Sequence, residues 1–239
     1  MTWSIVVHEP STGAFAVAVA TRSFAVGASC PFVRAGVGAV STQSMTNRYL
    51  GPAVLDALAR GLVPAAAIEV ALAKDGGRDL RQLNVVDAEG RAAQWTGSKC
   101  VEWCGGRSSP HLSVAGNMLV GSLVVDATYD AFLANASLAL PERLLAALDA
   151  GEAAGGDRRG RQSASMLITT TEDFPDLDLR VDDHAAPLEE LRRLVELWNP
   201  YWQSRQAWLP TKANPSGSAD IDAIEEAWQA QGLAIRFRR

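Results

Sequence analysis

Two apolar runs separated by a short turn constrain the fold of this chain most strongly. Ser4–His8 and Ala14–Thr21 are apolar, and Glu9–Gly13 between them has the Pro, Ser and Gly composition of a turn. This pattern predicts an antiparallel β-hairpin. Every residue of Ala14–Ala20 is apolar, which is typical of a strand covered on both faces. The sequence therefore predicts a sheet buried between other layers.

The remaining predicted elements come in groups rather than in strict alternation. Strands are predicted at Gly36–Thr42, Leu83–Asp87, Arg91–Thr96, Val114–Leu119, Gln162–Thr169 and Leu177–Val181, and helices at Gly51–Arg60, Pro64–Lys74, Ser122–Leu133, Pro141–Ala150, Pro187–Trp198 and Ile221–Gln231. Alternating strands and helices would indicate a parallel sheet. This grouping instead indicates an α+β fold in which two antiparallel sheets lie between helical layers.

The composition changes near residue 199, where tryptophans stand among Pro, Gln, Asn and Ser. We expect one domain over residues 1–198 and an extension over residues 199–239. Three tryptophans of the extension are too apolar to leave in water, so they should cover the domain or a partner subunit: Trp202, Trp208 and Trp228. We therefore expect a homo-oligomer, a dimer or larger.

Composition and charge exclude several classes of protein. The 22 basic and 27 acidic residues give a net charge of −5, which argues against a nucleic-acid partner. No apolar stretch approaches the ~20 residues of a membrane-spanning helix, and the N-terminus lacks the basic start of a signal peptide. The three cysteines, Cys30, Cys100 and Cys104, cannot all pair, which favours the cytoplasm. No His or Cys spacing fits a metal site, so we expect no metal and no cofactor.

Thr2 is the first candidate for chemistry. After removal of Met1, its hydroxyl would share a residue with a free α-amine, whose ordinary pKa is about 7.7–8.0. A base of that strength beside a hydroxyl can activate the hydroxyl as a nucleophile. The alternative interpretation is an ordinary first residue of a strand.

Further polar clusters follow the predicted strands. Thr21, Arg22 and Ser23 end the second apolar run, and the hairpin should bring them beside Thr2. The alternative is a solvated strand end. Asn117, after Gly116, would contribute an amide to a site or lie in a turn.

A polar run precedes the helix predicted at Gly51–Arg60. The backbone N–H groups of Thr42, Gln43 and Ser44, with the amide of Asn47, could hold an oxyanion. Helix capping by Ser44 or Asn47 explains the same residues equally well.

The segment Gly155–Ala164 combines glycines with charged and small polar residues. Its glycines permit close backbone approach, and an arginine such as Arg159 can bind a carboxylate or phosphate. Asp157 could orient an amine, while Gln162 and Ser163 open an apolar strand. The alternative for the arginines is a solvated face. No Gly-Lys-Ser/Thr follows, so the segment is not a P-loop.

Taken together, these segments resemble those of a known family. The resemblance lies in several short segments: Thr2–Ile5, Ala18–Ser23, Gly36–Gln43, Asn47, Tyr49–Gly51, Arg81–Gln82, Val86–Asp87, Thr96–Gly97, Gly116–Asn117 and Gly155–Ala164. Over about residues 2–198 the chain resembles the DUF1028 family of bacterial and archaeal proteins. That family is assigned to the N-terminal nucleophile (Ntn) hydrolases, whose fold is a four-layer αββα sandwich.

The resemblance implies hydrolysis of an amide bond by Thr2 after loss of Met1. Proteasome β-subunits are similar more loosely, since they also begin with Thr and place polar residues at matching strand ends. The residues that would fill similar places here are Thr21, Arg22, Asp157 and Ser163. The third-strand region lacks the lysine that proteasomes keep there, and Arg34 is the nearest cation.

We therefore expect a cytoplasmic amidohydrolase that cleaves a small amide or a peptide-like bond. The Thr2 amine acts as the base, Asp157 and Ser163 orient it, and an oxyanion is held by the Thr42–Ser44 N–H groups with Asn47 or Asn117. The residues expected to bind substrate, including an anionic group such as a carboxylate, are Arg22, Ser23, Gln43, Arg159 and Gln162. Two alternatives stay open: a non-catalytic binding or assembly protein that keeps Met1, and a hydrolase with Ser163 or Cys30 as an internal nucleophile.

Overall fold

The structure is a computed structural model that describes residues 2–206 and 208–233, apart from the side chains of 200–204 and 206. The strands are β1 (Thr2–Glu9), β2 (Ala14–Thr21), β3 (Pro31–Arg34), β4 (Gly38–Ser44), β5 (Arg81–Asp87), β6 (Ala92–Thr96), β7 (Gly105–Ser109), β8 (Leu112–Asn117), β9 (Ser163–Thr169) and β10 (Leu177–Val181). The α-helices are α1 (Leu50–Ala59), α2 (Pro64–Leu72), α3 (Leu123–Ala134), α4 (Leu140–Ala153), α5 (Pro187–Gln206) and α6 (Ile221–Ala230). The chain divides into two compact units, Met1–Arg192 and Arg193–Arg239.

The strands of the first unit form two antiparallel sheets. One has the order β10-β9-β2-β1-β8-β7 and the other the order β3-β4-β5-β6. β1 pairs with β2 from Thr2–Thr21 to Glu9–Ala14, which confirms the predicted hairpin. The two sheets face each other: β3 contacts β2 and β9, β4 and β5 contact β1, and β6 contacts β7 and β8.

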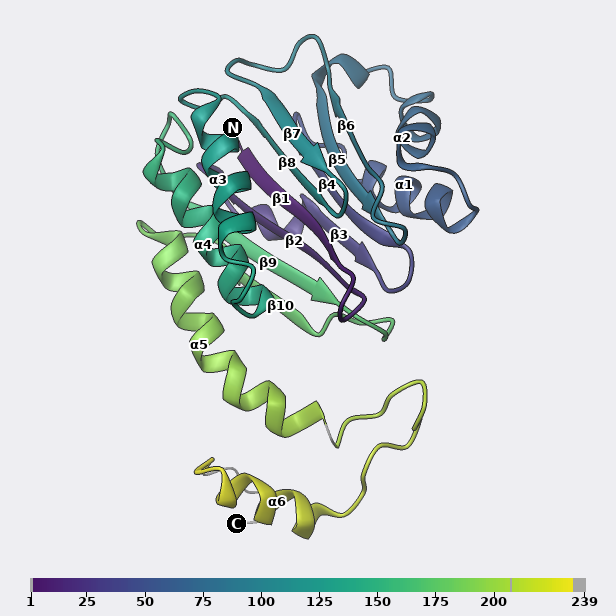
Figure 1. The fold of residues 1–239 in the computed structure, drawn as a ribbon, viewed down its shortest axis with the longest axis vertical. Coiled ribbons are helices and arrows are strands. Elements are labelled where there is room, and N and C mark those ends of the chain that lie inside the picture. Colours follow the sequence, from purple (N-terminus) through teal and green to yellow (C-terminus); the bar gives the residue numbers. More distant parts are fainter. Residues whose placement is uncertain (1, 207, 234–239) are drawn as a thin grey trace. The chain divides into compact units, whose positions relative to one another are not determined.

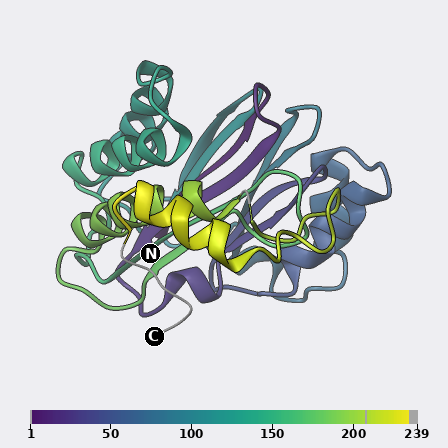
Figure 2. The ribbon, with the colours of Figure 1, turned by 90° about the horizontal axis from the view of Figure 1, so that it is seen from below.

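Helices lie on the outer face of each sheet. Figure 1 shows α1 and α2 along the β3–β6 sheet, and both helices contact strands of that sheet. α3 and α4 pack against each other and contact β1 and strands beside it in the other sheet. Figure 2 shows the two helix pairs on opposite sides of the strands. The prediction of an α+β fold with two antiparallel sheets is confirmed.

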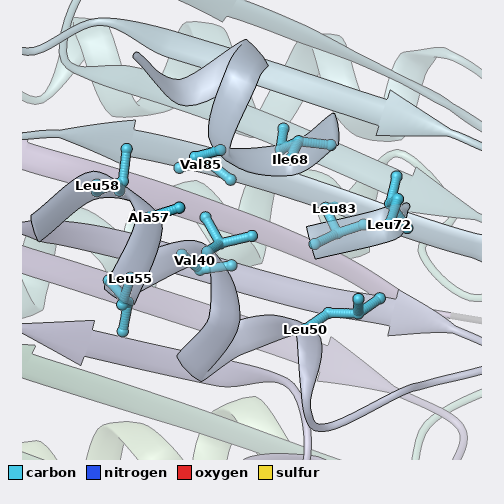
Figure 3. Close-up of a cluster of buried hydrophobic side chains, with 11 residues drawn as sticks. Val40, Leu50, Leu55, Ala57, Leu58, Ile68, Leu72, Leu83 and Val85 are labelled. Atoms are coloured by element: carbon cyan, nitrogen blue, oxygen red, sulfur yellow. The ribbon is translucent and has the colours of Figure 1, made fainter. Parts of the chain in front are cut away.

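A buried aliphatic cluster joins the β3–β6 sheet to its helices. Val40, Leu83 and Val85 of the strands pack against Leu50 and Leu72 of α1 and α2, among others (Figure 3). Each of these side chains stabilises the fold by about 1.5–3 kcal/mol through burial. In the other sheet all eight residues of β2 are buried, as its unbroken apolar run predicts.

Two strands, β3 and β7, were not predicted from the sequence. Both lie at the edge of their sheet. β7 reads Gly-Gly-Arg-Ser-Ser and pairs with β8 through its backbone. An edge strand of this kind needs only one row of backbone hydrogen bonds, so its side chains carry little of the usual strand pattern.

The second unit contains α6 and the last part of α5. α5 continues to Gln206, beyond the predicted end at Trp198. Trp228 and Ile224 are buried, and both line a cavity of about 130 Å³ together with Trp208. The Trp202 side chain lies outside the described residues. None of the helices in the described ranges is both long and apolar enough to cross a membrane.

Candidate active site

Four polar side chains lie side by side at one end of the six-stranded sheet. Thr2 on β1 pairs with Thr21 on β2 and with Asn117 on β8, and Thr21 pairs with Ser163 on β9. Residues directly opposite on neighbouring strands project from the same face of a sheet. We refer to Ser163, Thr21, Thr2 and Asn117 as the polar row. All four are buried, and Thr2 is the most exposed of them at 7%.

The strand pairing fixes which atoms of Thr2 face which neighbour. The His8 N–H donates to the His111 carbonyl at 3.0 Å, so residues 8 and 111 form a hydrogen-bonded pair of the β1–β8 ladder. Hydrogen-bonded pairs recur at every second residue, which makes Thr2 and Asn117 another such pair. The Thr2 nitrogen therefore faces Asn117. Its hydroxyl lies 3.2 Å from the hydroxyl of Thr21 on the other side.

A group of buried amide side chains supports the polar row from the opposite sheet. Gln82 donates from Nε2 to the carbonyls of Gly116 at 2.8 Å and Gly105 at 3.3 Å. Since carbonyls only accept, these bonds fix the orientation of the Gln82 amide. Its Oε1 then accepts from Gln43 Nε2 at 2.9 Å and from Asn117 Nδ2 at 3.0 Å.

Gln82 belongs to the segments that carry the family resemblance, but it was not predicted as a site residue. The available signal was a polar residue directly before the apolar strand predicted at Leu83–Asp87. Asn84 was missed as well, and it accepts from Ser4 Oγ at 3.2 Å while donating to the Ser113 carbonyl at 3.2 Å. Both residues are fully buried. Buried amides of this kind are recognisable only once the facing sheet is known.

The expected role of Asn117 as an oxyanion donor needs correction. Its Nδ2 donates to Gln82 and reaches the Thr2 carbonyl at 3.5 Å, so the amide N–H groups are directed at protein acceptors. Its Oδ1, in contrast, is buried and has no hydrogen-bond partner among the described residues. A buried polar atom without a partner is uncommon in native proteins.

Two other expected oxyanion donors also bind protein acceptors. The Thr42 N–H donates to the Cys30 carbonyl at 3.0 Å, and Asn47 Nδ2 donates to Asp75 Oδ2 at 2.9 Å. Gln43 Nε2 binds Gln82 and the Ala115 carbonyl at 3.1 Å. Ser44 is the last residue of β4, and its φ of 73° lies in the left-handed region.

Four non-glycine residues of the described chain have a positive φ: Ala25, Ser44, His111 and Met118. Met118 lies directly after Asn117 and has a φ of 54°. Non-glycine residues in this region are uncommon and cost about 1–3 kcal/mol each. Such conformations are frequent at functional sites, and Met118 is adjacent to Asn117 of the polar row.

The Gly155–Ala164 loop lies beside the end of β2. Asp157 is buried, and its carboxylate accepts from the Arg22 N–H at 2.6 Å and the Arg159 N–H at 2.8 Å. The Gln162 N–H donates to the Thr21 carbonyl at 3.0 Å, and Gln162 Oε1 accepts from Arg22 Nη1 at 2.6 Å. The loop and the strand end therefore form one hydrogen-bonded structure.

Two arginine side chains, Arg22 and Arg159, lie beside this end of the polar row. Arg22 is exposed, and Arg159 keeps 40% of its side chain exposed while Nη2 lies 3.3 Å from Asp157. Ser23 is exposed as well, and its carbonyl accepts from Ser163. Arg34, in contrast, lies opposite Gly38 at the start of β4 and pairs with Asp56 of α1 at 2.8 Å.

Neither internal nucleophile is activated in this structure. The Ser163 hydroxyl is fully buried, donates to the Ser23 carbonyl at 2.5 Å and accepts from the Val26 N–H at 3.1 Å. Burial raises the pKa of the Cys30 thiol to about 11, although hydrogen bonds from Ser29 and Thr46 act in the opposite direction. At neutral pH the thiol is therefore protonated and a poor nucleophile.

A family model described as "Family of unknown function (DUF1028)" matches residues 2–191. The chain belongs to this family. The DUF1028 resemblance read from the sequence is thereby confirmed. The crystal structure of protein SPO2555 from Silicibacter pomeroyi, also a DUF1028 protein, is similar to this chain with 32% sequence identity and a TM-score of 0.85. The match covers 92% of this DUF1028 protein and 96% of the other chain.

Other solved structures are much less similar to this DUF1028 protein. A Gly-1 mutant of Anbu from Hyphomicrobium sp. strain MC1 has 14% identity and a TM-score of 0.38, over 85% of this chain and 95% of that one. Anbu (ancestral beta-subunit) from Yersinia bercovieri has 12% identity and a TM-score of 0.37, over 87% and 98%. Scores of this size do not establish a common fold. No curated protein matches the chain.

The side chains that could ligate a metal are dispersed in the described part of this DUF1028 protein. Nowhere there do three or more His, Cys, Asp or Glu residues gather as a metal site. The polar row itself consists of three hydroxyls and an amide.

Proposed function

We propose that this DUF1028 protein is an Ntn hydrolase that cleaves a small amide or peptide-like C–N bond with Thr2 as the nucleophile. The observation that carries this proposal is the place of Thr2 in the polar row. Its hydroxyl contacts the Thr21 hydroxyl, and its nitrogen faces Asn117. Two facing sheets with a helix pair outside each agree with the proposed four-layer αββα sandwich.

In the proposed reaction, removal of Met1 exposes the Thr2 α-amine. The amine takes the proton of the Thr2 hydroxyl as Oγ1 attacks the substrate carbonyl carbon. When the tetrahedral intermediate collapses, the C–N bond breaks and the ammonium group donates its proton to the leaving nitrogen. A water molecule, deprotonated by the same amine, then hydrolyses the ester on Oγ1 and restores the threonine.

Ser44 is the oxyanion donor that we propose. N–H groups of alternate strand residues point the same way, so the Ser44 N–H has the direction of the Thr42 N–H, towards β3. β3 begins at Pro31, opposite Ser41, so Ser44 lies beyond the part of β4 that pairs with β3, although it pairs with Arg81 of β5. An N–H in this position can donate a hydrogen bond to a substrate oxygen instead of to a carbonyl of β3.

Two arginines beside the polar row, Arg22 and Arg159, suggest the class of substrate. Arg22 and Arg159 can bind a carboxylate in a bidentate manner. Suitable substrates are acylated amino acids, cyclic amides and short peptides with a free carboxylate. Asp157 holds both arginines at the polar row through its hydrogen bonds to their backbone N–H groups.

Intact mass and a substrate screen test this function. Protein from its own cells should begin at Thr2 and hydrolyse members of a library of carboxylate-bearing amides. Thr2→Ala should be folded and inactive, and Thr2→Ser should retain part of the activity. Thr12→Ala, an exposed turn residue, is the matched control and should be fully active.

Each alternative gives a different result in the same experiment. Activity in protein that keeps Met1 would contradict the proposal and favour an internal nucleophile. Retained Met1 with no activity on any amide would favour a binding or assembly protein.

A further inference from the structure

We propose that Asn117 is a positioning residue for the Thr2 α-amine, and that its Oδ1 accepts a hydrogen bond from this amine once Met1 is removed. The inference rests on the proposed function. It assigns Asn117 the opposite hydrogen-bonding role from the oxyanion donor expected from the sequence.

The orientation of the Asn117 amide follows from backbone carbonyls that cannot donate. The carbonyls of Gly116 and Gly105 accept from Gln82, so Gln82 must present its Oε1 to Asn117. The Asn117 atom that donates to this Oε1 must therefore be Nδ2, and the two atoms are 3.0 Å apart. Its Oδ1 is then the remaining polar atom of the amide, buried and without a partner in the described ranges.

The number of hydrogens on the Thr2 nitrogen explains why an acceptor is left over. While Met1 is attached, this nitrogen is an amide with a single N–H. The alternation of the β1–β8 ladder directs that N–H to the Asn117 backbone carbonyl. Removal of Met1 adds further N–H groups to the same nitrogen, directly opposite the residue that holds the unpartnered Oδ1.

This arrangement also orients the lone pair of the amine. A neutral amine has two N–H groups and one lone pair. If the backbone carbonyl and Oδ1 of Asn117 accept the two N–H groups, the lone pair is turned away from β8. The Thr2 hydroxyl lies on that other side, in contact with Thr21. The amine is then held ready to take the hydroxyl proton.

The titration of the amine tests the inference without using activity. A chain that begins at Thr2 is made by cleaving a leader peptide, and the ¹⁵N-labelled α-amine is followed by NMR against pH. Loss of an acceptor disfavours the ammonium form, so Asn117→Leu should lower the titration midpoint by about 0.5–1 pH unit. Asn117→Asp places a negative charge there and should raise it by about 1–3 pH units.

Gln94→Leu is the matched control, because it also removes a strand amide, one that donates to Arg107, Ser113 and Val114 and not to the polar row. It should leave the midpoint unchanged, and thermal unfolding shows whether each variant is folded. The inference is overturned if the midpoint moves in neither Asn117 variant. Since the leader is cleaved artificially, a chain that titrates as expected but hydrolyses no amide would contradict the proposed function and leave the role of Asn117 standing.

Discussion

Thr2 and Thr21 face each other across β1 and β2, and their hydroxyl oxygens are 3.2 Å apart. They form a pair without ladder hydrogen bonds, in which opposing side chains approach most closely. A shift of one residue in register would turn either side chain to the other face of the sheet. The hairpin therefore determines the surroundings of the proposed nucleophile.

Removal of the Thr21 hydroxyl should slow the reaction without unfolding the protein. In Thr21→Val the Thr2 hydroxyl loses the neighbour that orients it, so we expect kcat to fall by about 10–100-fold. Circular dichroism should show an unchanged fold. Thr21→Ser keeps the hydroxyl and should recover most of the rate, whereas full activity of Thr21→Val would show that Thr21 has no role.

Asp157→Asn should impair both stability and rate. One oxygen of the carboxylate is replaced by an NH₂ group, which cannot accept from the N–H groups of Arg22 or Arg159. We expect a loss of about 1–3 kcal/mol in the free energy of unfolding and a rate about 10–10³-fold lower. Asp56→Asn removes an exposed ion pair with Arg34 and should change stability by less than about 1 kcal/mol. Equal effects of the two variants would contradict this prediction.

Cys30 should make stability decrease in alkaline solution. Its pKa is about 11 in the folded chain, above its ordinary value of 9.0, so the unfolded chain loses the thiol proton first. This contribution is complete below pH 9 and is lost between pH 9 and 11, by about 3 kcal/mol. Denaturant unfolding should show the advantage of the wild type over Cys30→Ala shrinking by this amount over the same range. A constant difference up to pH 11 would mean that the thiol is not desolvated.

The extension should contribute to a homo-oligomer. Trp208 is half-buried, and a tryptophan ring offers about 150–250 Å² of surface to a partner. Deletion of residues 199–239 should therefore lower the number of subunits per particle that light scattering gives. Trp208→Ser should have the same effect if this ring lies in the interface. An unchanged number of subunits in both variants would place the subunit contact elsewhere.

Local sequence patterns predicted most of the helices and strands, because the burial of a strand and the pairing within a hairpin depend on residues that are close in the sequence. The unbroken apolar run of β2 predicts a strand buried on both faces, and all eight of its residues are buried. The Gly-Gly-Arg-Ser-Ser segment of β7 gave no such signal, because an edge strand is held by backbone pairing. The pairing of Thr2 with Thr21 could be predicted as well, since both lie in one hairpin.

The sequence by itself determined which residues can do chemistry, the hairpin that joins Thr2 to Thr21, and the family. Only the tertiary structure decided the direction of each hydrogen bond. Asn117 is a plausible oxyanion donor in sequence, but Gln82, 35 residues away, engages its Nδ2 and leaves Oδ1 without a partner. The physical reason is that an amide has a donor end and an acceptor end. Which end faces the site depends on carbonyls of strands that are distant in the chain.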